Sequence, residues 1–198
     1  MDLSYSNINL FPSIIHQFDV NGFSEIQDKL IDYAYDLKKR EPEGVLISNQ
    51  GGWQSSDFSV NNEDDTLHSF LINCLAGFPV IDESFNIKVD AWVNINKPGD
   101  YNIKHNHPSN DLAGVLWIKC PEDCGVIVFD TPTSFQSHNE VESYTDEFRN
   151  SNNYNHCHYF NPIEGRILVF PSHLQHHVLH NKSEEDRISV SFNIKLKK

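Results

Sequence analysis

The sequence predicts a mainly β protein, a sandwich or jelly roll, with helices at its N-terminal end. Apolar residues recur at helical spacing only before about residue 80, whereas short apolar stretches separated by turn-forming residues begin at Ile87. Helices gathered at one end of a series of strands are typical of layered domains with one core. We therefore expect residues 1–198 to form a single domain, with the arm and helices in residues 1–86 and the jelly-roll core in residues 87–196.

The N-terminal part is expected to hold an arm and two helices. Residues 1–22 read as an extended arm that packs along a sheet edge. The first helix is predicted over residues 24–40, because its apolar residues fall on one face and Ser24 to Gln27 match a capping box. The second is predicted over residues 63–77, where three acidic residues near the start favour the helix N-terminus.

The remaining chain is expected to form a β core with one long insert. Turn signals containing Pro, Gly, Asn or Asp separate eight predicted strands, at residues 87–96, 101–107, 112–119, 125–130, 156–161, 166–170, 175–180 and 186–196. Residues 131–155 are polar, and a loop of this length in a compact domain is usually functional or disordered. We expect a mobile lid in which Tyr144 and Phe148 contact the substrate; a disordered spacer is the alternative.

Composition excludes several classes of function. The formal net charge of -13 disfavours nucleic acid and anionic membranes as partners, since both require basic patches. No apolar run approaches the roughly 20 residues of a membrane span, and the N-terminus lacks the pattern of a signal peptide. Four cysteines do not make a disulfide framework. A cytoplasmic location is expected, with a small molecule or a peptide as substrate.

Three histidines form the most informative pattern. His105 and His107 are two residues apart in a predicted strand and therefore share a face. His176 begins another predicted strand, which neighbours the first in a jelly roll. Three neutral imidazoles on a rigid β scaffold suit a divalent metal such as iron, zinc or copper.

The spacing between the third histidine and a following arginine is also informative. Arg187 lies 11 residues after His176, so antiparallel neighbours can bring the two close together, and Ser189 shares the face of Arg187. A surface ion pair with a nearby glutamate is the alternative for Arg187. If Arg187 points inward, burial requires an anionic partner, because a buried unpaired charge is costly.

These stretches together resemble a known family. The segments VDAWVNINKPGDYNIKHNHPSNDLAGVLWIKCP, EGRILVFPSHLQHHV and DRISVSFN are similar to the iron(II)/2-oxoglutarate-dependent oxygenases, and in particular to a prolyl-hydroxylase-related group with an H-x-H-P pattern. The segment SNQGGWQS also resembles that group. The resemblance covers roughly residues 45–196, and the fold that it implies is a double-stranded β-helix.

The resemblance implies a reaction and a set of site residues. Iron(II) would be held by His105, His107 and His176, with 2-oxoglutarate as co-substrate and ascorbate as a possible reductant. The carboxylate of 2-oxoglutarate far from the metal would bind Arg187 and Ser189, with Tyr101 and Asn94 as further pocket residues and Trp92 and Trp117 as weaker candidates. The reaction would hydroxylate an amino-acid side chain, free or in a peptide, or another small substrate.

The sequence departs from the common form of this site and leaves alternatives open. Most relatives of this fold have a carboxylate where His107 stands, and Asp111 is the nearest substitute. A cupin-like metal-binding module without oxygenase turnover is the leading alternative, and a metallohydrolase is disfavoured because no carboxylate stands beside the triad. A structural zinc site built from Cys120, Cys124 and the His156–His158 segment has loose spacing, so free thiols are expected instead.

Overall fold

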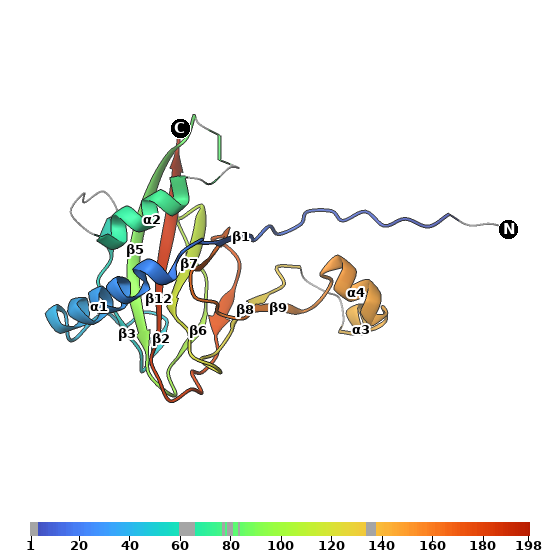
Figure 1. Cartoon of the computed structure of the whole chain (residues 1–198). Coiled ribbons are helices and arrows are strands. Elements are labelled where there is room, and N and C mark those ends of the chain that lie inside the picture. Colours follow the sequence, from blue (N-terminus) through green and yellow to red (C-terminus); the bar gives the residue numbers. More distant parts are fainter. Residues whose placement is uncertain (1–3, 60–65, 77, 79–80, 83, 134–137) are drawn as a thin grey trace.

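Two antiparallel β-sheets pack face to face in the computed structural model, with two helices on the outer face of the larger sheet (Figure 1). The structure describes residues 4–59, 66–76, 78, 81–82, 84–133 and 138–198. The predicted acidic start of the second helix, at residues 63–65, and its predicted end at Gly77 lie outside these residues. None of the described helices is long and apolar enough to cross a membrane.

The larger sheet has seven strands and the smaller one has five. The order in the larger sheet is β1-β10-β7-β12-β5-β3, with β4 also paired to β5, and the order in the smaller sheet is β2-β6-β11-β8-β9. The strand bounds are β1 His16–Asp19, β2 Asn49–Gln50, β3 Trp53–Gln54, β4 Phe58–Ser59, β5 Asn86–Asn96, β6 Tyr101–His105, β7 Leu112–Lys119, β8 Ile127–Asp130, β9 Cys157–Phe160, β10 Arg166–Pro171, β11 His176–Val178 and β12 Arg187–Lys197.

The eight predicted strands are confirmed as β5 to β12, with shifts of one or two residues at most of their ends. Four short strands, β1 to β4, add to them from the N-terminal part of the chain. The fold is a mainly β double-stranded β-helix, as the sequence predicts. Its central strands β5 and β12 pair in unbroken register from Arg187 opposite Asn96 to Lys197 opposite Asn86, which gives the larger sheet a continuous inner face.

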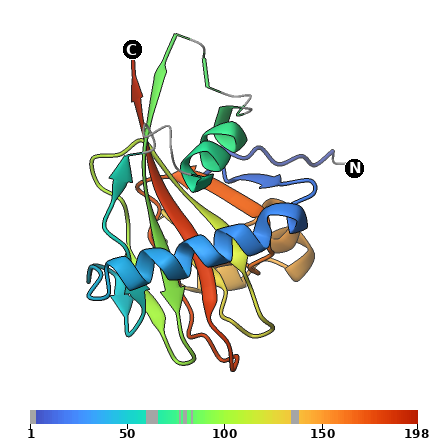
Figure 2. The ribbon, with the colours of Figure 1, turned by 60° about the vertical axis from the view of Figure 1, so that its left-hand side comes forward.

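Helix α1 spans Ser24–Arg40 and helix α2 spans Thr66–Ala76, and both cover the outer face of the larger sheet (Figure 2). Their buried leucines join one apolar cluster with the outward-facing residues of the sheet strands. The predicted bounds of the first helix are confirmed, but the predicted capping box is wrong. The N-cap is Phe23 and has no side-chain cap, while Gln27 instead donates to the Ile118 carbonyl of β7 at 2.8 Å.

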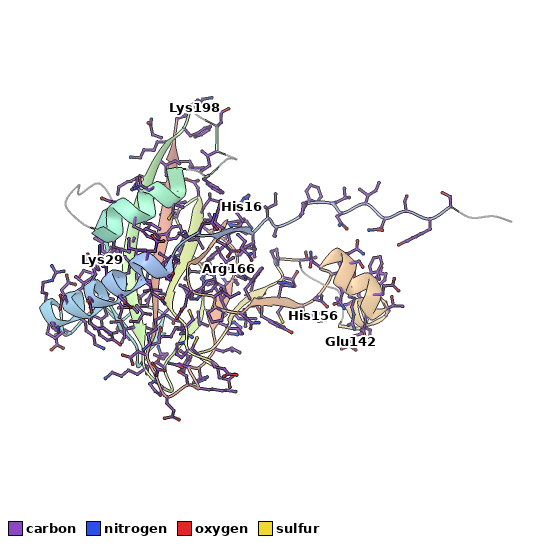
Figure 3. All side chains as sticks on the ribbon, viewed as in Figure 1. His16, Lys29, Glu142, His156, Arg166 and Lys198 are labelled. Carbon is purple, nitrogen blue, oxygen red and sulfur yellow. The ribbon has the colours of Figure 1, made fainter. Side chains whose placement is uncertain are left out.

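The N-terminal arm reaches the edge of the larger sheet, as the sequence predicts. Strand β1 begins at His16 and pairs with β10, which begins at Arg166 (both residues are labelled in Figure 3). An ion pair of 2.7 Å between Arg166 Nε and Asp19 Oδ1 reinforces the pairing. The preceding described residues extend away from the body of the molecule (Figure 1). They include exposed apolar side chains such as Phe11, which is 95% exposed.

The insert between β8 and β9 contains helices rather than a loop without structure. Helix α3 spans His138–Glu142 and helix α4 spans Asp146–Asn152, and both protrude on the same side as the arm (Figure 1). The hydroxyl of Thr145 caps α4 by accepting a hydrogen bond from the Phe148 amide. The rings of Tyr144 and Phe148 stack at 4.7 Å, and Tyr154 packs on both, so the insert has a small aromatic centre of its own.

Candidate metal and co-substrate site

A cavity of about 50 Å³, with both apolar and polar residues in its wall, lies between the two sheets. Apolar side chains of the sandwich interior, including Trp117, Ile127 and Phe170, form part of its wall. The rest of the wall is polar, which is unusual for the interior of a β-sandwich and indicates a binding function. The polar lining consists of Ser48, Asn94, Asn96, Asn102, His105, His107, His176, Arg187, Ser189 and Ser191.

The three predicted histidines meet at one end of this cavity. Strand β6 pairs with β11 so that His105 lies directly opposite His176. His107 follows the end of β6, where its backbone N–H donates to the Ser172 carbonyl at 2.9 Å and fixes the start of the turn. One ring nitrogen from each histidine lies within 4.8 Å of the others, so the three can hold one metal ion.

The hydrogen bonds of two imidazoles leave their Nε2 atoms free for a metal. His105 Nδ1 lies 2.8 Å from the Ile103 carbonyl and His176 Nδ1 lies 2.9 Å from the Leu174 carbonyl, so each Nδ1 carries the proton and donates. His107 Nε2 and His176 Nε2 are 3.3 Å apart. Two nitrogens bound at about 2.1 Å to one ion, at a right angle, lie about 3 Å apart, so the observed spacing suits shared ligation.

The surroundings keep all three imidazoles neutral at pH 7. Burial, together with the neighbouring histidines, lowers the pKa of His107 to about 3 and that of His176 to about 4. Burial also lowers the pKa of His105. Metal ligation requires the unprotonated ring. The donor set therefore fits a divalent metal with no proton to displace.

Asp111 does not belong to this group. Its side chain accepts a hydrogen bond of 2.7 Å from the Leu196 amide, and the residue is exposed. Among the described residues, the three histidines are the one group of side chains placed to share a metal ion. The nearest carboxylate in the sequence is therefore turned toward the end of β12, and no zinc cluster forms around the cysteines among the described residues.

The remaining histidines of the motif lie elsewhere. His173 is exposed in the turn before β11, and His177 points to the opposite face of the strand from His176, as alternation requires. The ring of His180 packs against Tyr101 with 4.2 Å between centroids. None of these three lines the cavity.

Inward-facing residues of β12 and β5 form a polar row behind the histidines. On β12, Arg187, Ser189 and Ser191 line the cavity at every second position, and they lie opposite Asn96, Asn94 and Trp92 of β5. Asn94 Nδ2 donates to Ser191 Oγ at 3.0 Å. The predicted residues Asn94, Arg187 and Ser189 thus line the same cavity as the three histidines.

Arg187 carries a buried charge without a carboxylate partner. The side chain is 2% exposed, and none of the ion pairs among the described residues includes it. Its Nη1 donates to the backbone carbonyls of Cys124, Gly125 and Leu179. Burial lowers the pKa of this guanidinium. Carbonyl oxygens hold Arg187 in place without neutralising it, so the cavity has a positive charge in its wall.

Tyr101 is the one predicted pocket residue that the structure places outside the cavity. Simple alternation puts Tyr101, His105 and His107 on one face. The pairing of β6 with β11 is irregular, however: His105 lies opposite His176, but Asn102 lies opposite Val178, so β6 has one extra residue. The bulge turns Asn102 into the cavity and leaves Tyr101 against His180.

Four polar lining residues were absent from the predicted site. Asn96 and Ser191 follow from alternation along β5 and β12, so the signal for them was present in the sequence. Asn102 depends on the bulge. Ser48 reaches the cavity because the short strand β2 lies beside β6, and its hydroxyl accepts from Asn102 Nδ2 at 3.1 Å.

Comparison with protein families gives a match over the site. Residues 90–193, slightly more than half of the chain, match the family model described as "Putative 2OG-Fe(II) oxygenase". The chain belongs to this family. It is an iron(II)/2-oxoglutarate-dependent oxygenase, as the three-histidine pattern and Arg187 predicted through resemblance. No curated protein matches the sequence.

Solved structures of low sequence identity share the fold of this oxygenase. A prolyl-4-hydroxylase from Pseudomonas putida is 14% identical, with a TM-score of 0.60 and 93% of each chain covered. HygX from Streptomyces hygroscopicus, solved with nickel, 2-oxoglutarate and hygromycin B, is 10% identical, with a TM-score of 0.62 over 91% of this chain and 82% of its own. A prolyl hydroxylase from Trichoplax adhaerens, solved with a hypoxia inducible factor peptide fragment, is 10% identical, with a TM-score of 0.59 over 91% of this chain and 83% of its own.

Proposed function

We propose that His105, His107 and His176 hold the iron of this oxygenase and that Arg187 and Ser189 bind the far carboxylate of 2-oxoglutarate. Together, the metal, 2-oxoglutarate and dioxygen supply the oxidation, in which 2-oxoglutarate is converted to succinate and carbon dioxide. The single observation that carries the assignment is the buried, uncompensated guanidinium of Arg187 in the same cavity as three neutral imidazoles. A dicarboxylate can bind the metal with one carboxylate and Arg187 with the other.

The protein side chains hold and orient the reactants. The carbonyls of Ile103 and Leu174 fix the rings of His105 and His176, so these ligands need little rearrangement on metal binding. Arg187 offers its remaining N–H groups to a carboxylate, and Ser189 adds a hydroxyl on the same strand face. Asn94 and Asn96, on the neighbouring strand β5, are further donors for the co-substrate.

We propose an amino-acid side chain, free or within a peptide, as the hydroxylated substrate. A groove of about 720 Å³ lies between the N-terminal arm, the insert and strands β8 and β9. Phe129 lines this groove, and its ring centroid lies 5.6 Å from that of His176. The groove therefore ends one aromatic ring away from the proposed metal site. The net charge of -13 supports a substrate other than nucleic acid.

Two broader proposals accompany this assignment. We infer that residues 1–198 act as a single oxygenase domain, because the helices of the N-terminal part and the strands of the β core share one apolar cluster. We also propose a cytoplasmic location, for which the four unpaired cysteines are the support, since thiols persist in reducing compartments.

Succinate formation from 2-oxoglutarate is the direct test. Purified protein with Fe(II) and ascorbate should release succinate slowly without a prime substrate, and faster with the correct one. Candidate peptides and free amino acids, incubated in the same way, should gain the mass of one oxygen atom. If iron binds but 2-oxoglutarate neither binds nor turns over, the chain is a cupin-like metal-binding module, and this proposal is overturned.

A further inference from the structure

The connection between β7 and β8 wraps around Arg187. Strand β7 belongs to the larger sheet and ends at Lys119, whose ladder partner on β12 is Ile188. Cys120 therefore follows directly beside Arg187 at the end of the neighbouring strand. The chain then turns, with the Cys124 amide donating to the Pro121 carbonyl at 3.2 Å, and enters β8 of the smaller sheet at Ile127.

This connection supplies most of the carbonyls that hold the guanidinium. Arg187 Nη1 donates to the Cys124 carbonyl and lies 3.3 Å from the Gly125 carbonyl. The fit leaves little freedom, because a Cβ at Gly125 would lie 2.9 Å from Arg187 Nη1 and still closer to the Leu179 carbonyl. Gly125 also has a φ of 90°, which other residues rarely adopt. A small shift of residues 124–125 must therefore move the guanidinium.

Two thiols bracket the same turn. Cys120 and Cys124 are both unpaired, and their side chains lie within hydrogen-bonding reach of each other. Cys124 is 1% exposed, whereas Cys120 is half-buried and packs at the margin of the apolar layer between the sheets. The hydrogen bond from Cys120 and the charge of Arg187 lower the pKa of the Cys124 thiol, and the neighbouring Cys124 raises the pKa of Cys120. Cys124 is the better thiolate of the pair.

We propose that Cys120 and Cys124 form a reversible disulfide that displaces the carbonyl cradle of Arg187 and so weakens binding of 2-oxoglutarate. The proposal rests on the assigned role of Arg187. Hydrogen peroxide is the oxidant: the O–O bond breaks as the Cys124 sulfur takes one oxygen as a sulfenic acid, and the first water leaves. Cys120 then attacks that sulfur, the S–S bond forms, and the second water leaves. Both sulfurs lose one electron, and the two thiol protons end in water.

Bond formation requires movement of the cradle. The two sulfurs of a disulfide are about 2.05 Å apart, much closer than two hydrogen-bonded thiols. Cys124 is buried and leads directly into Gly125, so closing this gap must pull the Cys124 carbonyl relative to Arg187. The metal ligands lie on β6, β11 and the turn after β6, and none of the bonds that hold their rings involves residues 120–125. Oxidation should therefore weaken binding of the co-substrate and leave metal affinity unchanged.

The experiment measures thiol state and 2-oxoglutarate affinity separately. Metal-free protein is oxidised with hydrogen peroxide, which avoids iron–peroxide side reactions, and catalase then removes the excess. Peptide mapping should show a Cys120–Cys124 link and the loss of two hydrogen atoms. After loading with Mn(II), calorimetric titration should give a dissociation constant for 2-oxoglutarate at least fivefold higher than in the reduced protein, with unchanged Mn(II) affinity. Dithiothreitol should restore the reduced value.

Two variants complete the test. Cys120→Ser should bind 2-oxoglutarate equally with and without peroxide treatment, whereas Cys157→Ser, which removes the exposed thiol on β9, should remain sensitive. If Cys120→Ser does not fold, mapping and dithiothreitol reversal on the unaltered chain still decide the matter. Absence of the disulfide, or a disulfide with unchanged or tighter 2-oxoglutarate binding, overturns the switch alone. Failure of the reduced protein to bind 2-oxoglutarate overturns the proposed function as well.

Discussion

Backbone carbonyls orient the side chains in both parts of the cavity, the three histidines in one and Arg187 in the other. At the histidine end, backbone carbonyls accept from Nδ1 of His105 and His176, and the free lone pairs face inward. At the arginine end, backbone carbonyls accept from one nitrogen of Arg187 while a full positive charge stays in the interior. The histidines could therefore hold a cation, and Arg187 is the residue that we propose for an anion.

The difference shows why neither end explains the cavity alone. Neutral imidazoles are stable in the interior without a ligand, because burial simply keeps their pKa low. Arg187 cannot lose its charge in this way, so its burial costs stability until an anion binds. Three buried histidines are therefore expected in several kinds of metal-binding protein, whereas the proposed role of Arg187 requires a ligand with a carboxylate far from the metal. Variants at the two ends should separate these roles.

The largest effect is expected at the histidine end. His176 is 4% exposed, and its ring contacts both other histidines. His176→Ala removes one of three metal ligands, so iron binding and succinate formation should be abolished. Metal analysis of the purified variant and a succinate assay measure both. The circular dichroism spectrum should remain that of the folded protein.

His177→Ala is the matched control, since it removes the neighbouring imidazole from the opposite face of β11. It should retain iron and turnover. Stoichiometric iron and full activity in His176→Ala would show that the triad does not form the metal site.

Arg187→Ala should weaken binding of 2-oxoglutarate but not of the metal. Loss of a buried charge-assisted contact costs about 2–5 kcal/mol, so 2-oxoglutarate binding should weaken by well over tenfold while metal affinity changes little. Ser189→Ala removes one hydrogen bond to a charged group, worth about 1.5 kcal/mol, and should weaken binding by roughly tenfold. Arg166→Ala, which breaks only the ion pair with Asp19 at the sheet edge, is the control. Equal 2-oxoglutarate titrations for Arg187→Ala and the unaltered chain would remove Arg187 from the pocket.

A smaller effect should appear in the pH dependence of the metal-free protein. The pKa of His107 is about 3 and that of His176 is about 4 in the folded chain, against an ordinary value of 6.5. The unfolded chain therefore binds more protons in the interval between these values, and the free energy of unfolding should decrease as pH falls from about 6.5 toward 4. Urea unfolding at pH 7 and pH 5 measures the loss. A His107→Gln, His176→Gln double variant should lose less, and an equal loss would show that these histidines do not cause it.

Most of the strands and many of the site residues could be predicted from the sequence. Short apolar runs and turn signals identified all eight core strands, and alternation put Arg187 and Ser189 on one face of their strand, because residue spacing on a regular strand dictates direction. The family resemblance selected His176 among the neighbouring histidines and implied that Arg187 points inward. Tyr101 lies outside the cavity lining because a bulge in β6 changes the face between Asn102 and His105, and nothing in the local residues predicts this bulge. Two of the three carbonyl partners of Arg187 come from a turn 62 and 63 residues earlier in the chain, so only the folded structure reveals them.

Shortening the insert in residues 131–155 should have the smallest effect on iron and 2-oxoglutarate binding. It should nevertheless change which substrate is hydroxylated. Its stacked Tyr144 and Phe148 line the groove, and the insert leaves from Asp130 of β8, which pairs with Cys157 of β9. A four-residue turn can therefore join Asp130 to Cys157 without disturbing the ladder. Iron and 2-oxoglutarate binding should be unchanged in the shortened chain.

A lid role for this insert predicts a split between two reactions. Succinate formation without prime substrate should survive the shortening, because the metal and co-substrate residues are intact. Coupled hydroxylation should be lost, because the groove loses the wall that holds the substrate beside Phe129. Measuring succinate and hydroxylated product in the same reaction tests the split, and Tyr144→Ala with Phe148→Ala in the full-length insert should reproduce part of it. If the shortened protein hydroxylates its substrate as well as the parent, residues 131–155 are only a spacer.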